Sequence, residues 1–417
     1  MHSMAHHGPS QAYDTIRQEP LQGVFPMKSY LSHLECTSCG QLFSHEQAIG
    51  TCSTCGKVLF ARYDLASAKK HLDPHEFIKR RPNIWRFFEL MPVINPLNVV
   101  SLGEGGTPLL KADNLGKSLA LKNLYVKDEG LNPTGSFKSR GISAAVSKAK
   151  ELNKQAITMP TAGNAGGALA AYAARAGIES HVFMPLDAPE SNKRECEILG
   201  AQLTLVDGLI SDAGRMSQEK ARIENLYDIS TLREPYRAEG KKTMALEIAL
   251  DLGWKTPDVI IYPTGGGTGI VGMWKAFNEL LELGWIDGTQ PRFISIQAEG
   301  CQPLVKAFAE GASETTPYPN ASTLASGLRV PSVFADYILL DIIQQTKGTA
   351  MAVSDSDMMT DMGILGSSEG IFACPEGAAT LTGLKALIQQ NFFSGDENII
   401  LMNTASGLKY LELFKNT

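Results

Sequence analysis

From about residue 99 onward, runs rich in β-branched residues alternate with amphipathic, helix-like stretches. This alternation is typical of an α/β protein in which the strands form largely parallel sheets. Ligands of such proteins bind beyond the carboxyl ends of the strands, so we expect a site at the strand-to-helix turns. The predicted strands cover residues 124–129, 156–161, 181–185, 202–207, 258–264, 293–299 and 398–404. The predicted helices include residues 139–152, 164–177, 241–252 and 270–283.

Charge and hydropathy limit the class of ligand. The chain has 38 Lys and Arg against 44 Asp and Glu, a net charge of −6, and no long basic run, so nothing favours nucleic acid as a partner. No apolar stretch approaches the roughly 20 residues that span a bilayer, and the N-terminus lacks the apolar core of a secretory signal. We therefore expect a cytoplasmic protein, without membrane or nucleic-acid partners, that acts on small molecules.

Histidines are concentrated near the N-terminus, where seven of the eight precede residue 76 and leave only His181 in the rest of the chain. A Ser-His-Asp or Cys-His mechanism would have to use His181 or the N-terminal region. The sequence therefore disfavours these classes of hydrolase.

Lys138 lies at a turn between a predicted strand and a predicted helix, in the segment LNPTGSFKSRG. Pro133 and Gly135 favour the turn. A lysine there, beside Phe137 and small residues, can lose part of its solvation, which lowers its pKa toward that of a nucleophilic amine. Lys138 is thus a candidate catalytic residue.

Two further turns have residues suited to anions. In PTAGNAGG the backbone N–H groups near Thr161 could hold a carboxylate, and the Asn164 amide could bond a ring hydroxyl. In PTGGGTGI the glycines and Thr268 form a backbone nest for a phosphate. The glycine spacing matches neither a Walker loop nor a dinucleotide-binding motif, so a single phosphate group is expected.

A fourth turn, ILMNTASG, brings the Thr404 hydroxyl to a strand end, where it could bond a pyridine nitrogen. Together the four turns supply an amine for an aldehyde, a partner for a ring hydroxyl, a phosphate nest and a partner for a ring nitrogen. These are the requirements of pyridoxal 5′-phosphate.

Four of the seven cysteines form two Cys-x-x-Cys pairs, Cys36/Cys39 and Cys52/Cys55, separated by twelve residues. This spacing is typical of a tetrahedral Cys₄ zinc site, and an odd total of cysteines argues against a disulfide framework. Four thiolates leave no open coordination position, so we expect a structural Zn²⁺ in a small ribbon and no catalytic role for it.

The motifs resemble those of the threonine synthase-like family of fold-type II pyridoxal phosphate enzymes. The resemblance covers residue 99 to the C-terminus, and it rests on the four turns together with SLGEGGTPLL and EGIFACPEGAATLTGL. It implies a tryptophan synthase β-like fold with two doubly wound domains, an N-terminal ribbon, and a homodimer. It also implies that Lys138 is the Schiff-base lysine. The implied cofactor contacts are Phe137, Lys138, Asn164, Gly265, Gly266, Gly267, Thr268 and Thr404, and the implied substrate contacts are Thr161, Ala162, Gly163 and Ala165.

The activity that the resemblance implies is conversion of O-phosphohomoserine and water to threonine and phosphate, through an aldimine on Lys138. Threonine synthases usually continue the lysine motif as Lys-Asp-Arg, whereas this chain has Ser139 before Arg140. Alternative activities are β-replacement, as in a cysteate synthase, and ammonia-lyase action on threonine or serine. A different class is an inactive scaffold whose ribbon binds a partner. Arg237, Lys241 and Lys242 are possible anion contacts.

We predict four regions along the chain. Residues 1–30 form a mobile tail and residues 31–62 the zinc-ribbon-like module. Residues 63–145 and 240–417 form the large cofactor domain, and residues 146–239 form a small mobile domain.

Overall fold

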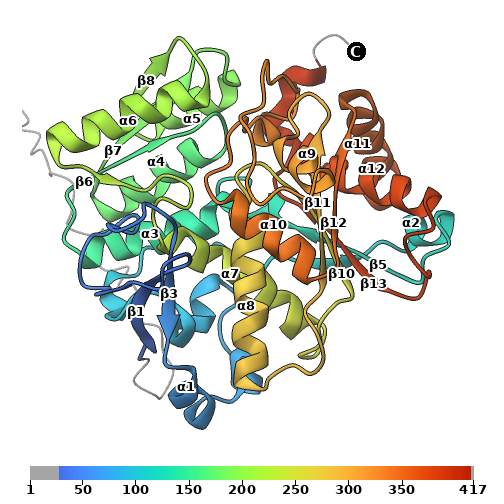
Figure 1. Cartoon of the computed structure of the whole chain (residues 1–417), viewed down its shortest axis with the longest axis horizontal. Helices are drawn as coiled ribbons and strands as arrows, with labels where there is room; N and C mark the ends of the chain where they lie inside the picture. Colours follow the sequence, from blue (N-terminus) through green and yellow to red (C-terminus); the bar gives the residue numbers. More distant parts are fainter. Residues whose placement is uncertain (1–27, 415–417) are drawn as a thin grey trace, which may run out of the picture.

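A computed structural model describes residues 28–414 of the chain. Most of the tail predicted for residues 1–30 therefore lies outside the described residues. The chain forms three sheets, which Figure 1 shows as the N-terminal ribbon in blue, a small α/β unit at the upper left, and a larger sheet at the right. Within the described part, no helix combines the length and apolarity needed to cross a lipid bilayer.

The largest sheet has six strands, and all neighbouring pairs are parallel except β4 with β5. In spatial order the strands are β12 (Thr349–Val353), β11 (Arg292–Ala298), β10 (Val259–Pro263), β13 (Asn398–Asn403), β5 (Asn123–Asp128) and β4 (Leu109–Lys111). Because β10, β13 and β5 are adjacent and parallel, the turns after their carboxyl ends lie at one edge of the sheet.

Helices cover both faces of this sheet, which explains the continuous apolar runs of its strands. Ile260 and Tyr262 of β10 join the hydrophobic core formed with α7, α8 and α10. Val259 and Ile261 point the other way, into the core formed with α2, α11 and α12. The helices are α7 (Tyr236–Asp251), α8 (Thr268–Leu283), α10 (Asp336–Gln345), α2 (Asp113–Ser118), α11 (Asp355–Glu369) and α12 (Pro375–Gln389), with α9 (Pro303–Ala309) between β11 and α10.

The second sheet has four parallel strands, in the order β8 (Gln202–Val206), β7 (Glu179–Pro185), β6 (Ala156–Pro160) and β9 (Tyr227–Asp228). One face packs on α3 and α4, where Met159 and Met184 are fully buried. Phe183 of the opposite face contacts α6. The helices of this unit are α3 (Lys138–Glu151), α4 (Ala165–Ala176), α5 (Glu190–Ile198) and α6 (Ile210–Glu224).

The third sheet is an antiparallel ribbon of β2 (Leu42–Phe43), β1 (Leu31–Cys36) and β3 (Leu59–Tyr63). It is followed by α1 (Leu65–His71) and by short 3-10 helices at Pro74–Lys79, Ile84–Leu90 and Pro96–Asn98. Further 3-10 turns occur at Glu129–Leu131, Ser326–Leu328 and Gly407–Phe414.

The predicted α/β architecture is confirmed, and each of the seven predicted strands is present. The sequence did not predict β12, a five-residue strand at the sheet edge whose residues are mostly half-buried and carry no strong pattern. The boundaries of the two predicted domains stay a prediction.

Candidate active site

The four predicted turns meet in one cavity of about 410 Å³, between the two α/β units. The cavity is lined by every residue predicted for the cofactor and the substrate: Phe137, Lys138, Thr161, Ala162, Gly163, Asn164, Ala165, Gly265, Gly266, Gly267, Thr268 and Thr404. Another cavity, of about 490 Å³ beside Glu247 and Asp251, contains none of them.

Lys138 is the first residue of α3, and its turn is attached to the end of β13. The Phe137 N–H donates to Thr404 O at 2.9 Å, and the Ser406 N–H donates to Gly135 O at 2.9 Å. Lys138 Nζ lies 4.0 Å from the centre of the Phe137 ring. These contacts hold the amine beside the turn that carries Thr404.

The surroundings of Lys138 favour its neutral form. Desolvation, and next the positive charge of Arg237, lower the pKa of Lys138 from 10.5 to about 7. The negative charge of Glu376 opposes this effect and does not cancel it. A substantial fraction of the amine is therefore unprotonated at neutral pH, as a nucleophile or a general base requires.

A buried cluster of charges anchors the helix that begins at Lys138. The Arg140 guanidinium, fully buried two residues later, donates from Nη2 to Glu129 Oε1 and to Glu247 Oε2, each at 2.7 Å. Lys127 Nζ lies 3.0 Å from Glu247 Oε2. Both carboxylates are thereby paired, so the cluster fixes α3 without leaving a buried charge uncompensated.

The glycine loop after β10 is a cradle that side chains would fill. A Cβ on Gly265 would lie 2.2 Å from Gly327 O, and one on Gly267 would lie 2.2 Å from a methyl carbon of Leu339. Gly267 also has a φ of +74°, which favours glycine. The loop leads into the sixteen-residue helix α8, so its N–H groups can bind an anion at the helix N-terminus.

Asn164 has one polar atom with no partner. Its side chain is buried at the N-terminus of α4, and Nδ2 donates to Tyr410 Oη at 3.4 Å, while Oδ1 makes no hydrogen bond. Tyr410 Oη in turn donates to Glu376 Oε1 at 2.7 Å. A buried amide oxygen without a hydrogen-bond partner costs free energy of folding. This position therefore favours a bound ligand that donates a hydrogen bond to Oδ1.

The loop that begins at Thr161 is held by its own side chain. Thr161 Oγ1 accepts the Gly163 N–H and lies 3.1 Å from Gly163 O, to which it can donate. On the opposite side, the Thr404 hydroxyl lies 3.8 Å from Cys374 Sγ, a weak contact that leaves it able to bond a ligand.

Comparison with known proteins assigns the family. The family described as pyridoxal-phosphate dependent enzyme matches residues 100–405. A threonine synthase of Methanocaldococcus jannaschii is 37% identical over 375 residues, which cover 90% of this chain and 92% of that protein. The chain belongs to the threonine synthase family of pyridoxal-phosphate-dependent enzymes. A Mycobacterium bovis member is 34% identical over 76% of this chain and 86% of its own.

Solved structures agree on the fold of this threonine synthase family member. Maize serine racemase superposes with a TM-score of 0.63 at 22% identity, covering 74% of this chain and 91% of that one. A fungal L-serine ammonia-lyase of Rhizomucor miehei also gives 0.63, over 75% and 98% of the two chains. The predicted fold-type II architecture and family membership are confirmed.

The cavity fits the family's cofactor, pyridoxal phosphate. It provides a lysine amine with a lowered pKa, a glycine cradle at a helix N-terminus, and a buried amide with an unpaired atom. Their chemistry matches an aldehyde, a phosphate and a ring hydroxyl in turn.

Ser139 replaces the aspartate usual in threonine synthases without leaving a gap in the hydrogen bonding. Its side chain is buried, and Ser139 Oγ lies 2.7 Å from Thr134 Oγ1. The turn beside Lys138 is therefore neutral at this position.

Several lining residues were not predicted. They include Arg215, Arg233, Ser326, Arg329, Phe334, Glu376 and Tyr410. Of the three possible anion contacts, only Arg237 lines the cavity. Lys241 donates to Phe137 O, and Lys242 pairs with Glu239 at 2.8 Å. Glu376 lies within a motif that carried the family resemblance, but nothing near the others in sequence signals a site.

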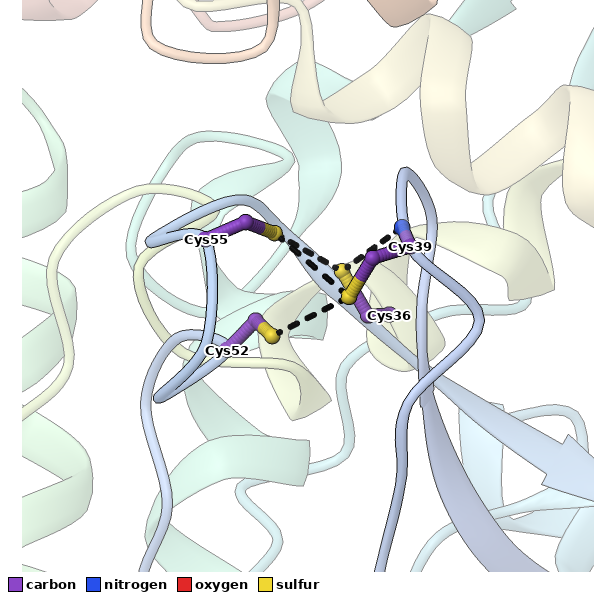
Figure 2. A group of neighbouring side chains, drawn as sticks. All are labelled: Cys36, Cys39, Cys52 and Cys55. Carbon is purple, nitrogen blue, oxygen red and sulfur yellow. Dashed lines mark hydrogen bonds between the residues drawn. The ribbon is translucent and has the colours of Figure 1, made fainter.

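The four predicted cysteines meet at the tip of the ribbon, and Figure 2 shows their sulfur atoms facing one another. All four lie within 4.8 Å of one another, and Cys36 to Cys55 measures 3.4 Å. A tetrahedron with Zn–S bonds of about 2.3 Å has edges of about 3.8 Å. The cluster therefore has nearly the size of a Cys₄ metal site.

Proposed function

We propose that this protein is a threonine synthase, which converts O-phosphohomoserine and water to threonine and phosphate with pyridoxal phosphate bound at Lys138. The observation that carries the proposal is one cavity that combines Lys138, the glycine cradle and Arg237. The close similarity to threonine synthases over nearly the whole chain supports it.

In this proposal each predicted residue contacts a different part of the cofactor. Gly265, Gly266, Gly267 and Thr268 hold the phosphate, Asn164 bonds the ring hydroxyl, and Thr404 faces the ring nitrogen. Phe137 packs beside the Lys138 amine. When bound, the cofactor supplies an electron-withdrawing ring that stabilises negative charge at the carbon bearing the substrate's amino group.

The loop after β6 receives the substrate's carboxylate. Thr161, Ala162, Gly163 and Ala165 surround this position, at the N-terminus of the twelve-residue helix α4. Backbone N–H groups and the helix dipole both favour an anion there.

Arg237 is suited to the substrate's phosphate. Its guanidinium is buried, donates from Nη1 to Ile229 O at 2.8 Å, and has no partner at Nε. Desolvation lowers the pKa of Arg237 to about 10, so it stays cationic at neutral pH. A buried cation with a free donor forms strong, charge-assisted bonds to phosphate oxygens.

Lys138 moves the protons of the reaction. Its neutral amine takes a proton from Cα of the substrate and transfers protons at Cβ. The bond between Cγ and the phosphate oxygen breaks, water adds its oxygen to Cβ, and Cγ gains a proton to become the methyl group of threonine. One water is consumed and one phosphate is released for each threonine formed.

A panel of substrates tests the activity. The purified holoenzyme should release inorganic phosphate and threonine from O-phosphohomoserine, and Lys138→Ala should abolish this activity. Product that depends on sulfite and phosphoserine would replace this assignment with a cysteate synthase, and keto acid from threonine or serine with an ammonia-lyase. Failure of borohydride to fix the cofactor to Lys138, with no turnover, would support the scaffold.

We also propose that the four ribbon thiolates bind a structural Zn²⁺. The size of the cluster supports this, and four protein ligands complete a tetrahedral site. The homodimer that the family resemblance implies and the cytoplasmic location that the sequence predicts stay predictions.

A further inference from the structure

We propose that Arg233 is a second phosphate-binding residue in the outer part of the cavity, and that the cysteine ribbon holds it in position. The ligand is a phosphate dianion, either as the ester of the substrate or as the free product. The identity of the ester rests on the proposed function, whereas binding of inorganic phosphate does not.

Among the described residues, no carboxylate forms a hydrogen bond or ion pair with the Arg233 side chain, although the negative charge of Asp228 acts on it. Its guanidinium carbon lies 4.1 Å from the centre of the Phe334 ring, and among the described residues its side chain makes no hydrogen bond or ion pair. Burial lowers the pKa of Arg233, but an arginine remains charged at neutral pH. A partly desolvated guanidinium with free donors favours an anionic ligand.

The other arginines differ in their partners. Arg329 forms a two-pronged ion pair with Asp187, with both N–O distances 2.8 Å. Arg215 pairs with Asp212 at 2.5 Å. Arg233 and Arg237, four residues apart, are thus the two lining arginines of the described chain that no carboxylate pairs. The two arginines could bind one phosphate dianion together. Alternatively, Arg233 could bind it first in the outer part of the cavity and Arg237 further inside.

The ribbon contacts the backbone of Arg233. Gly50, between the two cysteine pairs, is so close that a Cβ there would lie 2.5 Å from Arg233 O. Nearby, Tyr236 Oη donates to His45 O at 3.3 Å. The ribbon therefore packs directly against the turn that presents Arg233.

The ribbon also contacts the segment that carries Phe334. Tyr337 Oη lies 2.7 Å from Thr37 Oγ1 and accepts the Val58 N–H at 3.3 Å. Thr37 follows Cys36 directly, so this contact lies next to the metal-binding cluster. The ribbon thus contacts both the segment that carries Arg233 and the segment that carries Phe334. These contacts give the ribbon a role in positioning the stacked pair at the cavity.

Arg233→Met tests the anion site because it keeps an apolar stem over Phe334 and removes the charge. We expect the Kd of the holoenzyme for inorganic phosphate, measured by calorimetry, and the KM for O-phosphohomoserine to rise at least about tenfold. Arg233→Lys should recover part of the affinity. Arg194→Met, which removes an exposed paired arginine that does not line the cavity, should change either constant less than about twofold.

Gly50→Ala tests whether the ribbon positions Arg233. The added methyl must displace the Arg233 carbonyl, so the Kd for phosphate should rise while cofactor content is unchanged. Gly366→Ala, where a Cβ meets nothing within 4 Å, is the control. If Gly50→Ala does not fold, Tyr236→Phe tests the neighbouring contact, in which Tyr236 Oη donates to His45 O of the ribbon.

The outcomes separate the claims. Unchanged phosphate affinity in Arg233→Met, or an equal loss of cofactor, would overturn the anion site. A loss in Arg233→Met with none in Gly50→Ala and Tyr236→Phe would overturn the ribbon's part. Phosphate binding that depends on Arg233, without turnover of O-phosphohomoserine, would retain the site and refute the threonine synthase assignment.

Discussion

The Lys138 amine should titrate near pH 7 in the cofactor-free protein. Desolvation and the neighbouring charge of Arg237 lower its pKa to about 7 from 10.5, so the unprotonated fraction at pH 7 should be about 10³-fold larger than that of an ordinary lysine. This fraction determines how readily the amine adds to an aldehyde.

Trace labelling measures this pKa directly. After hydroxylamine removes the cofactor, the protein is exposed to trace acetic anhydride at a series of pH values, and mass spectrometry quantifies acetylation of Lys138. An exposed lysine such as Lys347 reports the reagent dose. We expect a midpoint near pH 7 that moves upward in Arg237→Met, because removing a nearby cation favours the protonated amine. Arg215→Met, whose arginine is not among the causes of the shift, is the control.

The same pKa predicts a dependence of stability on pH. Between about pH 7 and 10.5 the folded protein binds fewer protons at Lys138 than the unfolded chain, so this residue makes stability increase with pH over that window. The stabilisation of cofactor-free Lys138→Met over wild type should therefore shrink as the pH rises. A wild-type labelling midpoint at or above about pH 10 would refute the reasoning.

Three other perturbations have defined outcomes. Arg140→Met should cost about 3–5 kcal/mol in urea unfolding, because it leaves the buried Glu129 carboxylate without a cationic partner and Glu247 with Lys127 alone, whereas Arg194→Met, on an exposed surface pair, should cost under about 1 kcal/mol. Gly265→Ala should lose bound cofactor in absorbance spectra, because its Cβ would lie 2.2 Å from Gly327 O, and a Gly366→Ala protein that loses as much would contradict this cause. A chelator should remove about one Zn²⁺ per chain and lower the melting temperature, and Cys36→Ser should have the same effect; an unchanged melting temperature would exclude a structural metal.

The sequence predicted those parts of the site that depend on local pattern. Lys138, the glycine loop and Thr404 each follow a strand of the six-stranded sheet, and Asn164 follows β6 of the second sheet. Parallel strands place such turns at the carboxyl edge of each sheet. The cysteine pairs were predicted from spacing alone. In both cases a short segment of sequence is enough to predict the role of its residues.

The remaining lining residues depend on tertiary packing. Arg237 and Lys241 are four residues apart on α7 and share a helix face, yet only Arg237 lines the cavity. Arg233 lies in the turn before α7, and Tyr410 lies at a kink in the short 3-10 segment Gly407–Phe414, so neither belongs to a long periodic element. Their roles become visible only when their partners, which are distant in the sequence, are known.

The contact between Thr37 and Tyr337 spans 300 residues, which has a consequence for biosynthesis. At about 5–20 residues per second, a ribosome needs roughly 15–60 s after completing the ribbon to make its partner surface. During this interval the four thiols remain undocked, and zinc would protect them from oxidation. If the four thiolates bind zinc as proposed, zinc supply during translation would affect the yield of folded protein as well as its stability afterwards.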